Sequence, residues 1–475
     1  MKKNSYLKIA MFVVPIMVLI GGGIFMLQQN IFANRSLENQ RKQIILISID
    51  TLRADHLPFY GYTRNTAPHM SELVERATLY KNTYANSPWT YPSHMTLLTG
   101  TLPSRHGVDK SFQTYVIDEA YPILNDSILN IAQILQDQGV HTIKYAFLPD
   151  EIGFNRGFDK NFLFDPLIKE VRFQKVLTEI EDNKNNDFFL FLHTWKVHAP
   201  YSGKTFLRQE KKDEIGDAID FEVGNKNYGE FVKFIQEKGL LNIKDCIDLY
   251  DGDIYYVDQY IKRLIDKCKQ AGIYDDMLFV IVSDHGEHFG ERNKELFYDI
   301  HGIAYYEEFV RIPFIVKYPY QTKQKVNYFA TSLVDFLPTV LDFYKIDIPD
   351  YVQGTSLLNG PGRDFVISEA TSLHGIEMKM IFRDKLKYVV TMKDPSGPGR
   401  VNWDSILKKE LYDVRIDPLE YHNLATLKQF KGACLDFEKL LVHNIAESAK
   451  FGGSKQQTTL NKDTIQQLKS LGYID

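Results

Sequence analysis

The stretch 44-IILISID-50 decides the fold class of this chain. Its residues are apolar except for Ser48 and the final Asp50. Continuous apolar runs of this length are typical of strands that are buried on both faces, as in parallel sheets. Three later segments follow the same pattern and predict further strands: 187-DFFLFLHTW-195, 276-DMLFVIVSDHGE-287 and 311-RIPFIVKYP-319.

Between these runs, apolar residues recur at helical spacing. One stripe begins at Ile128 and stops at Gly139, and a second runs from Ile254 to Cys268 and stops at Gly272. Strands that alternate with helices predict an α/β fold with a mostly parallel sheet. After about residue 360, short strand-like pieces separated by Gly, Pro and Asp predict a small antiparallel-sheet subdomain, and the tail from residue 430 has a polar helical pattern.

The composition excludes some classes of protein. The chain has 475 residues, 44% of them hydrophobic, with a net charge of −5 and no Lys/Arg-rich tract. Nucleic acid is therefore not an expected partner, because such binding depends on clustered positive charge. Cys246, Cys268 and Cys434 are odd in number and widely spaced, so they predict neither a disulfide framework nor a zinc ribbon.

The N-terminus carries a membrane signal. Ile9 to Leu27 contain no charged residue, and their length is near the roughly 20 residues that cross a bilayer. Lysines precede this segment and no clear cleavage site follows it, so a signal anchor is expected, although cleavage stays open. The short tail predicts a single-pass cell-membrane protein whose main domain lies on the periplasmic or extracellular side.

These signals predict five regions. Residues 1–8 would be a short cytoplasmic tail, 9–27 a transmembrane anchor, 28–42 a stalk, 43–360 the catalytic domain, and 361–475 the C-terminal subdomain with its helical tail.

Polar residues at the strand ends predict a metal site. Asp50, Asp284 and His285 fall at the carboxyl ends of expected strands, where parallel sheets bind their ligands. A hydroxyl at Thr90 lies in a polar stretch, 87-SPWTYPSHMTLLTGTLPSRHG-107. Two carboxylates, an imidazole and a hydroxyl can hold a divalent cation, which lowers the pKa of the hydroxyl and makes it a nucleophile.

Several ordered motifs resemble the sulfatase family of the alkaline phosphatase superfamily. They are 47-ISIDTLRADHLPFYGYTRNTAPHM-70, 97-LLTGTLPSRHGV-108, 250-YDGDIYYVDQYI-261, 283-SDHGEHFGER-292, 301-HGIAYYEEFVRIPFIV-316, and 334-VDFLPTVLDF-343 followed by 352-VQGTSLL-358. The resemblance covers about residues 43 to 430. It implies an alkaline-phosphatase-like three-layer α/β/α fold, with Asp50, Asp284 and His285 as metal ligands.

Thr90 stands where sulfatases place a Cys or Ser that is oxidised to formylglycine. The sequence reads Thr90-Tyr91-Pro92-Ser93-His94, so no formylglycine is expected and Thr90 would act unmodified as nucleophile and metal ligand. Two further departures are His94 in place of the motif's arginine and Thr51 in place of a second aspartate. A lysine and histidine that grip sulfate in the family have no counterpart near residues 139–150. Fewer carboxylates and a histidine ligand favour Mn²⁺ or Zn²⁺, with Ca²⁺ as the alternative.

Other histidines are candidate substrate contacts. His198 matches the family's His-x-Pro-Tyr motif, and His301 falls where sulfatases place an anion-binding lysine. Both are expected to act in catalysis, by binding an ester oxygen or by protonating the leaving alcohol. His94 and His193 are expected to bind substrate, and a structural role for His193 is an equal alternative.

The sequence thus predicts a metal-dependent hydrolase of phosphate or phosphonate esters that works through a covalent intermediate on Thr90. A sulfuric ester hydrolase is the second hypothesis. An envelope phospho-group transferase and a surface binding protein without turnover are further alternatives. The substrate, whether a small molecule, a sugar or a lipid ester, is not indicated.

Overall fold

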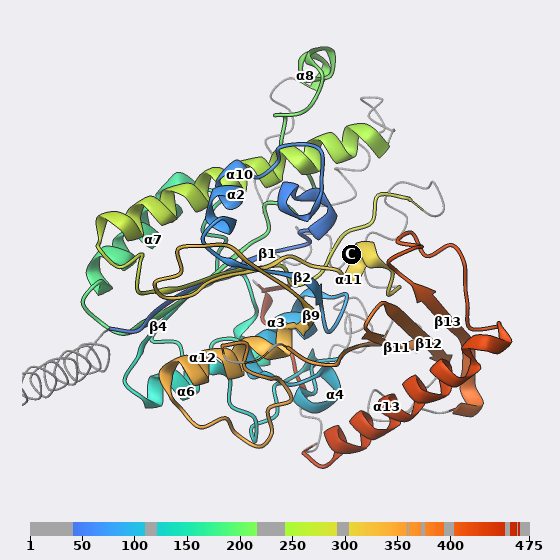
Figure 1. Ribbon diagram of the computed structural model, residues 1–475. Coiled ribbons are helices and arrows are strands. Elements are labelled where there is room, and N and C mark those ends of the chain that lie inside the picture. The colour runs from blue at the N-terminus through green and yellow to red at the C-terminus, as the bar shows by residue number, and fades with distance from the viewer. Residues whose placement is uncertain are drawn as a thin grey trace, which may run out of the picture. The chain divides into compact units, whose positions relative to one another are not determined.

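The computed structural model describes residues 41–109, 121–215, 243–291, 304–358, 360, 362–371, 376–393, 403–451, 457–462 and 464–465. From Gln43 onwards they belong to one compact unit, Gln43–Asp475 (Figure 1). The expected anchor at 9–27, the flanking segments 1–8 and 28–40, and His301 lie outside the described residues. Within the described part of the chain, no helix has the length and apolar character that crossing a membrane requires.

The core of the fold is an eight-stranded sheet in the order β5-β4-β6-β1-β7-β8-β2-β9. Its strands are β1 (Gln43–Ile49), β2 (Thr78–Tyr84), β4 (His141–Tyr145), β5 (Lys160–Phe162), β6 (Phe188–Thr194), β7 (Leu278–Val282), β8 (Phe314–Lys317) and β9 (Lys325–Ser332). β1 is central and pairs in parallel with β6 and β7. β8 alone in this sheet runs antiparallel to its neighbours. The mostly parallel sheet that the apolar runs predict is therefore confirmed.

Helices cover both faces of this sheet, because each strand sends alternate side chains to opposite sides. From β1, Ile44 and Leu46 pack on one face, and Ile45 and Ile47 on the other. The first face is covered by α3 (Thr90–Thr99), α6 (Ile131–Asp137) and α12 (Phe336–Tyr344), and the second by α2 (Pro68–Val74), α7 (Glu170–Asn183) and α10 (Ile243–Gln270) (Figure 1). The result is a three-layer α/β/α domain.

A second, antiparallel sheet follows in the order β10-β11-β12-β13, as expected for the C-terminal part. Its strands are β10 (Phe365–Thr371), β11 (Ile376–Arg383), β12 (Leu386–Lys393) and β13 (Ile406–Asp413), with α13 (Lys431–Ala449) packed on one face. The backbone N–H of Glu369 in β10 donates to the carbonyl of Asn86, 2.8 Å away. The small sheet is thereby joined to the segment that leads into Thr90.

Short elements complete the described chain. They are α4 (Pro103–His106), α8 (Gln209–Ile215), α11 (Glu307–Val310), a two-residue pair of β3 (Tyr121–Pro122) with β14 (Gln457–Thr458), and 3-10 turns at Ala54–His56, Pro58–Tyr60, Asp150–Ile152, Leu333–Asp335, Trp403–Ser405 and Lys428–Phe430. The three cysteines are buried and form no disulfide.

His106 at the end of α4 makes the fold sensitive to acid. Its Nδ1 accepts from the N–H of Val108, and its Nε2 lies 3.0 Å from the hydroxyl of Thr96. Burial lowers the pKa of His106 to about 3, whereas an unfolded histidine titrates near 6.5. The stability that neutral His106 contributes is therefore fully present above about pH 6.5. It is lost as the pH falls from 6.5 towards 3, because the unfolded state takes up the proton first.

We expect protonation of His106 in the unfolded state to lower the free energy of unfolding by about 2 kcal/mol between pH 7 and pH 5. Urea unfolding at both pH values should therefore show a smaller acid loss in His106→Gln, which keeps an N–H donor but cannot titrate. Equal acid losses in the two proteins would contradict this assignment.

Candidate active site

The first residue of helix α3 is Thr90, and its side chain is buried. The whole of this ten-residue helix is buried, and it ends at Gly100, whose φ of 64° lies in the left-handed region that glycine tolerates. The start of a helix carries partial positive charge from unpaired N–H groups. A hydroxyl placed there is favoured in its ionised form, and an anion beside it is stabilised.

Two carboxylates and an imidazole converge on Thr90. Asp50 follows β1 and Asp284 follows the adjacent β7, which explains why residues far apart in the sequence lie close together. His285 Nε2 lies 3.2 Å from Thr90 Oγ1, 3.6 Å from Asp50 Oδ1 and 3.5 Å from Asp284 Oδ2. All of the residues predicted as metal ligands are thus brought together, and all are buried.

The hydrogen bond made by the other nitrogen of His285 determines its tautomer. Nδ1 lies 2.9 Å from the carbonyl oxygen of Gly286, which can only accept, so Nδ1 carries the proton. In the neutral ring, Nε2 then presents a lone pair towards the carboxylates. Histidine ligands of metals are commonly fixed in this way, by a carbonyl that holds the second nitrogen.

The donor set fits a divalent cation. Asp50 Oδ1 and Asp284 Oδ2 are buried and have no hydrogen-bond partner among the described residues. Buried anionic oxygens without a partner are costly, so a cation between them would relieve a penalty that the chain alone does not. The ligand atoms of Asp50, Asp284 and His285 all lie within 4.8 Å of one another.

The pKa shifts of these groups reflect the same crowding. Burial and the charge of Asp50 together raise the pKa of Asp284 to about 6, against the opposing effect of His285. Burial also raises the pKa of Asp50, although His198 and His285 oppose this. For His285, burial alone would lower the pKa, but the two carboxylates outweigh burial and raise it.

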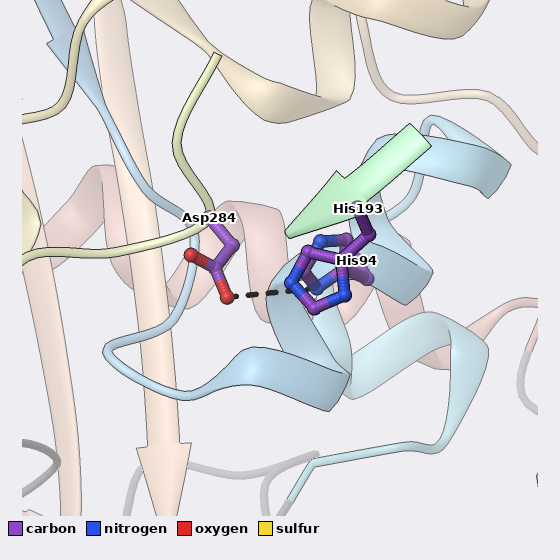
Figure 2. A group of neighbouring side chains, drawn as sticks. All are labelled: His94, His193 and Asp284. Carbon is purple, nitrogen blue, oxygen red and sulfur yellow. Dashed lines mark ion pairs between the residues drawn. The ribbon is translucent and has the colours of Figure 1, made fainter. Parts of the chain in front are cut away.

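His94 and His193 lie next to each other beside Asp284, with their ring centroids 4.3 Å apart (Figure 2). His94 comes from α3 and lies 3.5 Å from Asp284 Oδ2. His193 comes from β6 and lies 3.2 Å from Asp50 Oδ2. Both rings therefore contact the carboxylates directly, and their predicted binding of substrate stays a prediction.

The loop after β6 brings His198 to the site. His198 is buried, its ring centroid lies 5.5 Å from that of Trp195, and its charge lowers the pKa of Asp50. The loop is closed by Asp253 of α10, which pairs with Lys196 and accepts from the N–H of Ser202 at 2.8 Å. These contacts hold in place the loop that carries His198, whose role in catalysis stays a prediction.

Gly252 permits this loop to pack against α10. A Cβ atom on Gly252 would stand 2.1 Å from the carbonyl oxygen of Gly203, which is far closer than atoms tolerate. We expect Gly252→Ala to displace the loop, to lower the free energy of unfolding by about 1–3 kcal/mol, and to lower kcat/KM about tenfold.

Gly432 of α13 is the matched control for Gly252, because a Cβ there would meet nothing within 4 Å. Gly432→Ala should leave kcat/KM unchanged and slightly raise the melting temperature, since alanine favours helix. Thermal unfolding and steady-state kinetics check both variants, and normal kinetics in Gly252→Ala would contradict the predicted coupling.

Comparison with known protein families supports the resemblance seen in the sequence motifs. The sequence profile described as Sulfatase matches residues 42–346, which is more than half of the chain. The chain belongs to the sulfatase family. It is therefore an ester hydrolase of that family, as the motifs predict, and both the resemblance and the fold class are confirmed.

Individual sulfatase-family relatives span most of the chain. An arylsulfatase of Clostridium perfringens is 25% identical over 85% of this chain and 94% of its own. An N-acetylglucosamine-6-O-sulfatase of Bacteroides thetaiotaomicron is 31% identical over 82% of this chain and 83% of its own. The phosphonate monoester hydrolase structure of Agrobacterium radiobacter matches with a TM-score of 0.62 and 16% identity, covering 88% of this chain and 97% of that one.

The structure shows the surroundings of two residues that the sequence resemblance marks as departures, Thr51 and His94. Thr51, which replaces a second aspartate, has a φ of 56°, and its hydroxyl donates to the carbonyl of Val197 at 3.1 Å. Its side chain is thus engaged with the backbone of the β6 loop. His94, which replaces an arginine, is neutral because burial lowers its pKa to about 3.

Other polar groups near the site serve as supports. The guanidinium of Arg53 is held by Asp55, with contacts of 2.7 and 3.0 Å, and also by Glu291. Glu287 accepts from the hydroxyl of Tyr201 at 2.8 Å, and burial raises the pKa of this carboxyl to about 8. Arg53 therefore forms ion pairs with carboxylates of the chain.

Two supporting residues were missed at the level of sequence. Trp195 donates from its indole N–H to His193 Nδ1 at 3.0 Å. The hydroxyl of Ser48 lies 2.9 Å from His94 Nε2. The sequence did offer a clue to Ser48, because it is the polar residue inside the apolar run of β1 and lies two positions before Asp50.

Proposed function

We propose that this protein is a metal-dependent hydrolase of phosphate or phosphonate esters, with unmodified Thr90 as its nucleophile. The observation that carries the proposal is the position of Thr90 Oγ1. It lies 3.2 Å from His285 Nε2, the nitrogen that Asp50 Oδ1 and Asp284 Oδ2 also face. A hydroxyl in that place is surrounded by the groups that can activate it.

Asp50, Asp284 and His285 would hold the cation, together with the hydroxyl of Thr90. A bound divalent cation would lower the pKa of that hydroxyl and offset the negative charge of the ester. A donor set that includes an imidazole favours Mn²⁺ or Zn²⁺ over Ca²⁺.

The residues of the chain account for each bond that changes. Thr90 Oγ releases its proton to solvent and bonds to phosphorus, and the bond from phosphorus to the leaving oxygen breaks. His198 protonates that oxygen, and the leaving alcohol departs. Water then attacks the phosphothreonine and gives a proton back to His198. The bond from phosphorus to Thr90 Oγ breaks, Oγ regains a proton from solvent, and phosphate or phosphonate is released. The N-terminus of α3 stabilises the negative charge throughout.

The chemistry of threonine favours phosphorus over sulfur. In sulfatases the formylglycine hydrate eliminates sulfate through its second hydroxyl. The Cβ of Thr90 carries a methyl group and a single hydroxyl, so a sulfated Thr90 would lack this release step. A phosphorylated Thr90 can be hydrolysed directly at phosphorus.

A sulfuric ester hydrolase is the second candidate, and the comparisons support it. The arylsulfatase and the N-acetylglucosamine-6-O-sulfatase named above span most of this chain. The name of the second relative also makes sulfated sugars a class of substrate to test.

Parallel assays with p-nitrophenyl phosphate, a phenylphosphonate monoester and p-nitrophenyl sulfate decide between the two candidates. We expect kcat/KM for a phosphorus ester of the Mn²⁺- or Zn²⁺-loaded protein to exceed that for the sulfate ester at least tenfold. Faster turnover of the sulfate ester would overturn the proposal in favour of the second candidate.

We also propose that the protein is held at the cell membrane by residues 9–27. The support is the uncharged sequence of this segment and the lysines before it.

A further inference from the structure

His94 and His193, which contact the two carboxylates of the site, raise the question of a second cation. Ligand atoms of His94, His193 and Asp284 lie within 4.8 Å of one another, as close as those of the first group (Figure 2). Whether they form a metal site depends on which imidazole nitrogens have a lone pair to offer.

His193 has no lone pair for a cation. The indole N–H of Trp195 can only donate, and it lies 3.0 Å from His193 Nδ1, so Nδ1 accepts and carries no proton. The proton of the neutral ring is therefore on Nε2. This nitrogen lies 3.2 Å from Asp50 Oδ2 and donates to it.

His94 is engaged in the same manner with the opposite tautomer. Its Nδ1 lies 2.8 Å from the carbonyl oxygen of Thr90, so Nδ1 carries the proton. Its Nε2 lies 2.9 Å from the hydroxyl of Ser48, which can donate to it. Neither His94 nor His193 offers a nitrogen to a second ion, in contrast to His285.

The donation from His193 determines which oxygen of Asp50 faces the site. Oδ2 accepts from His193, whereas Oδ1 has no hydrogen-bond partner among the described residues and lies 3.6 Å from His285 Nε2. If His193 adopted the other tautomer, its lone pair would face Oδ2 and repel it. Asp50 would then lose this contact, which helps to fix its rotation.

We infer that Trp195 is a positioning residue for the candidate metal site: its indole N–H sets the tautomer of His193, which directs Asp50 Oδ1 towards the cation. Trp195 is well suited to this role because it is buried and held from several sides. Its backbone N–H donates to Asp165 at 2.6 Å, and its ring lies 5.8 Å from that of Phe147. This inference rests on the proposed metal site.

Trp195→Phe tests the inference, because it keeps an aromatic ring and removes the N–H. A group that hydrogen-bonds a metal ligand directly, as His193 does with Asp50, typically contributes 10- to 100-fold to metal affinity, and Trp195 acts on that group. We expect calorimetric titration of the metal-free protein with Mn²⁺ or Zn²⁺ to show at least tenfold weaker binding in the variant. Nitrogen NMR of the metal-free wild type should show His193 with its proton on Nε2, and Trp195→Phe should lose this pattern.

Phe147→Leu is the matched control, since it loosens the packing of the indole and leaves its N–H in place. It should lower the melting temperature without changing metal affinity or the nitrogen signals of His193. A proton on Nδ1 in the wild type, or unchanged affinity in Trp195→Phe, would overturn the role of Trp195. Absence of cation binding in the wild type would instead overturn the proposed metal site, so the two failures are distinguishable.

Discussion

Thr90→Ala should lose nearly all turnover and keep its metal. Removal of Oγ1 deletes the only atom of residue 90 that can bond to phosphorus, so we expect kcat to fall by about 10⁴-fold or more. Asp50, Asp284 and His285 are unchanged in this variant, so divalent-cation affinity should fall far less than activity. Steady-state kinetics and calorimetric titration of the same protein preparation measure the two quantities.

Two replacements that retain a nucleophilic atom complete the test. Thr90→Ser keeps the hydroxyl and should retain activity within about tenfold of the wild type, because only a methyl group is lost. Thr90→Cys introduces the residue that sulfatases oxidise and places a thiol, a softer metal ligand that suits Zn²⁺ better than Mn²⁺, beside His285. If it is produced without oxidation, it should lose phosphorus-ester turnover.

A trapped intermediate gives a readout that does not depend on rate. Acid quenching of the wild type during turnover of a phosphate ester should leave phosphate on Thr90, detectable by mass spectrometry of the peptide. If Thr90→Ala kept a tenth or more of the activity and no modified peptide formed, a water molecule rather than Thr90 would be the nucleophile.

The strand ends of the site could be predicted from sequence because they follow from a general rule. Apolar runs that end in polar residues become buried parallel strands, and the carboxyl ends of neighbouring strands lie together. This rule alone groups Asp50 with Asp284 and His285, as the pairing of β1 with β7 confirms. The rule does not predict the direction in which a strand runs. β8 has the same apolar character, but it runs antiparallel to β7.

The supporting hydrogen bonds could not be predicted in the same way. The assignment of Trp195 as a donor to His193 depends on the rotamers of two side chains at the end of β6, and spacing does not specify rotamers. Thr51 illustrates the same limit. Its place beside Asp50 suggests a ligand position, but its positive φ directs the hydroxyl to the carbonyl of Val197.

Asp284→Asn should abolish metal-dependent activity and yet stabilise the protein in chelator. Oδ1 of Asp284 accepts from the backbone N–H groups of Thr51 and His285, at 3.2 and 2.9 Å, and an asparagine oxygen can keep both contacts. The amide nitrogen would then replace Oδ2, the oxygen that has no hydrogen-bond partner among the described residues. A donor in that place cannot bind a cation, so we expect at least 100-fold weaker metal affinity.

The stabilisation follows from the electrostatics of the metal-free site. Ligand oxygens of Asp50 and Asp284 lie within 4.8 Å of each other, where two full charges repel by roughly 3 kcal/mol at an effective dielectric constant of about 20. The imidazole of His285 offsets part of this repulsion. Removing one charge should therefore raise the free energy of unfolding in EDTA by about 1–2 kcal/mol.

Asp55→Asn is the matched control, because Asp55 is a nearby carboxylate that is already paired with Arg53. This variant should be slightly less stable than the wild type and should bind the cation normally. Added Mn²⁺ or Zn²⁺ should raise the melting temperature of the wild type and of Asp55→Asn, but not that of Asp284→Asn, since a ligand stabilises only the state that binds it. If Asp284→Asn were less stable than the wild type in EDTA, the two carboxylates would be held by the chain itself, and the case for a cation between them would fail.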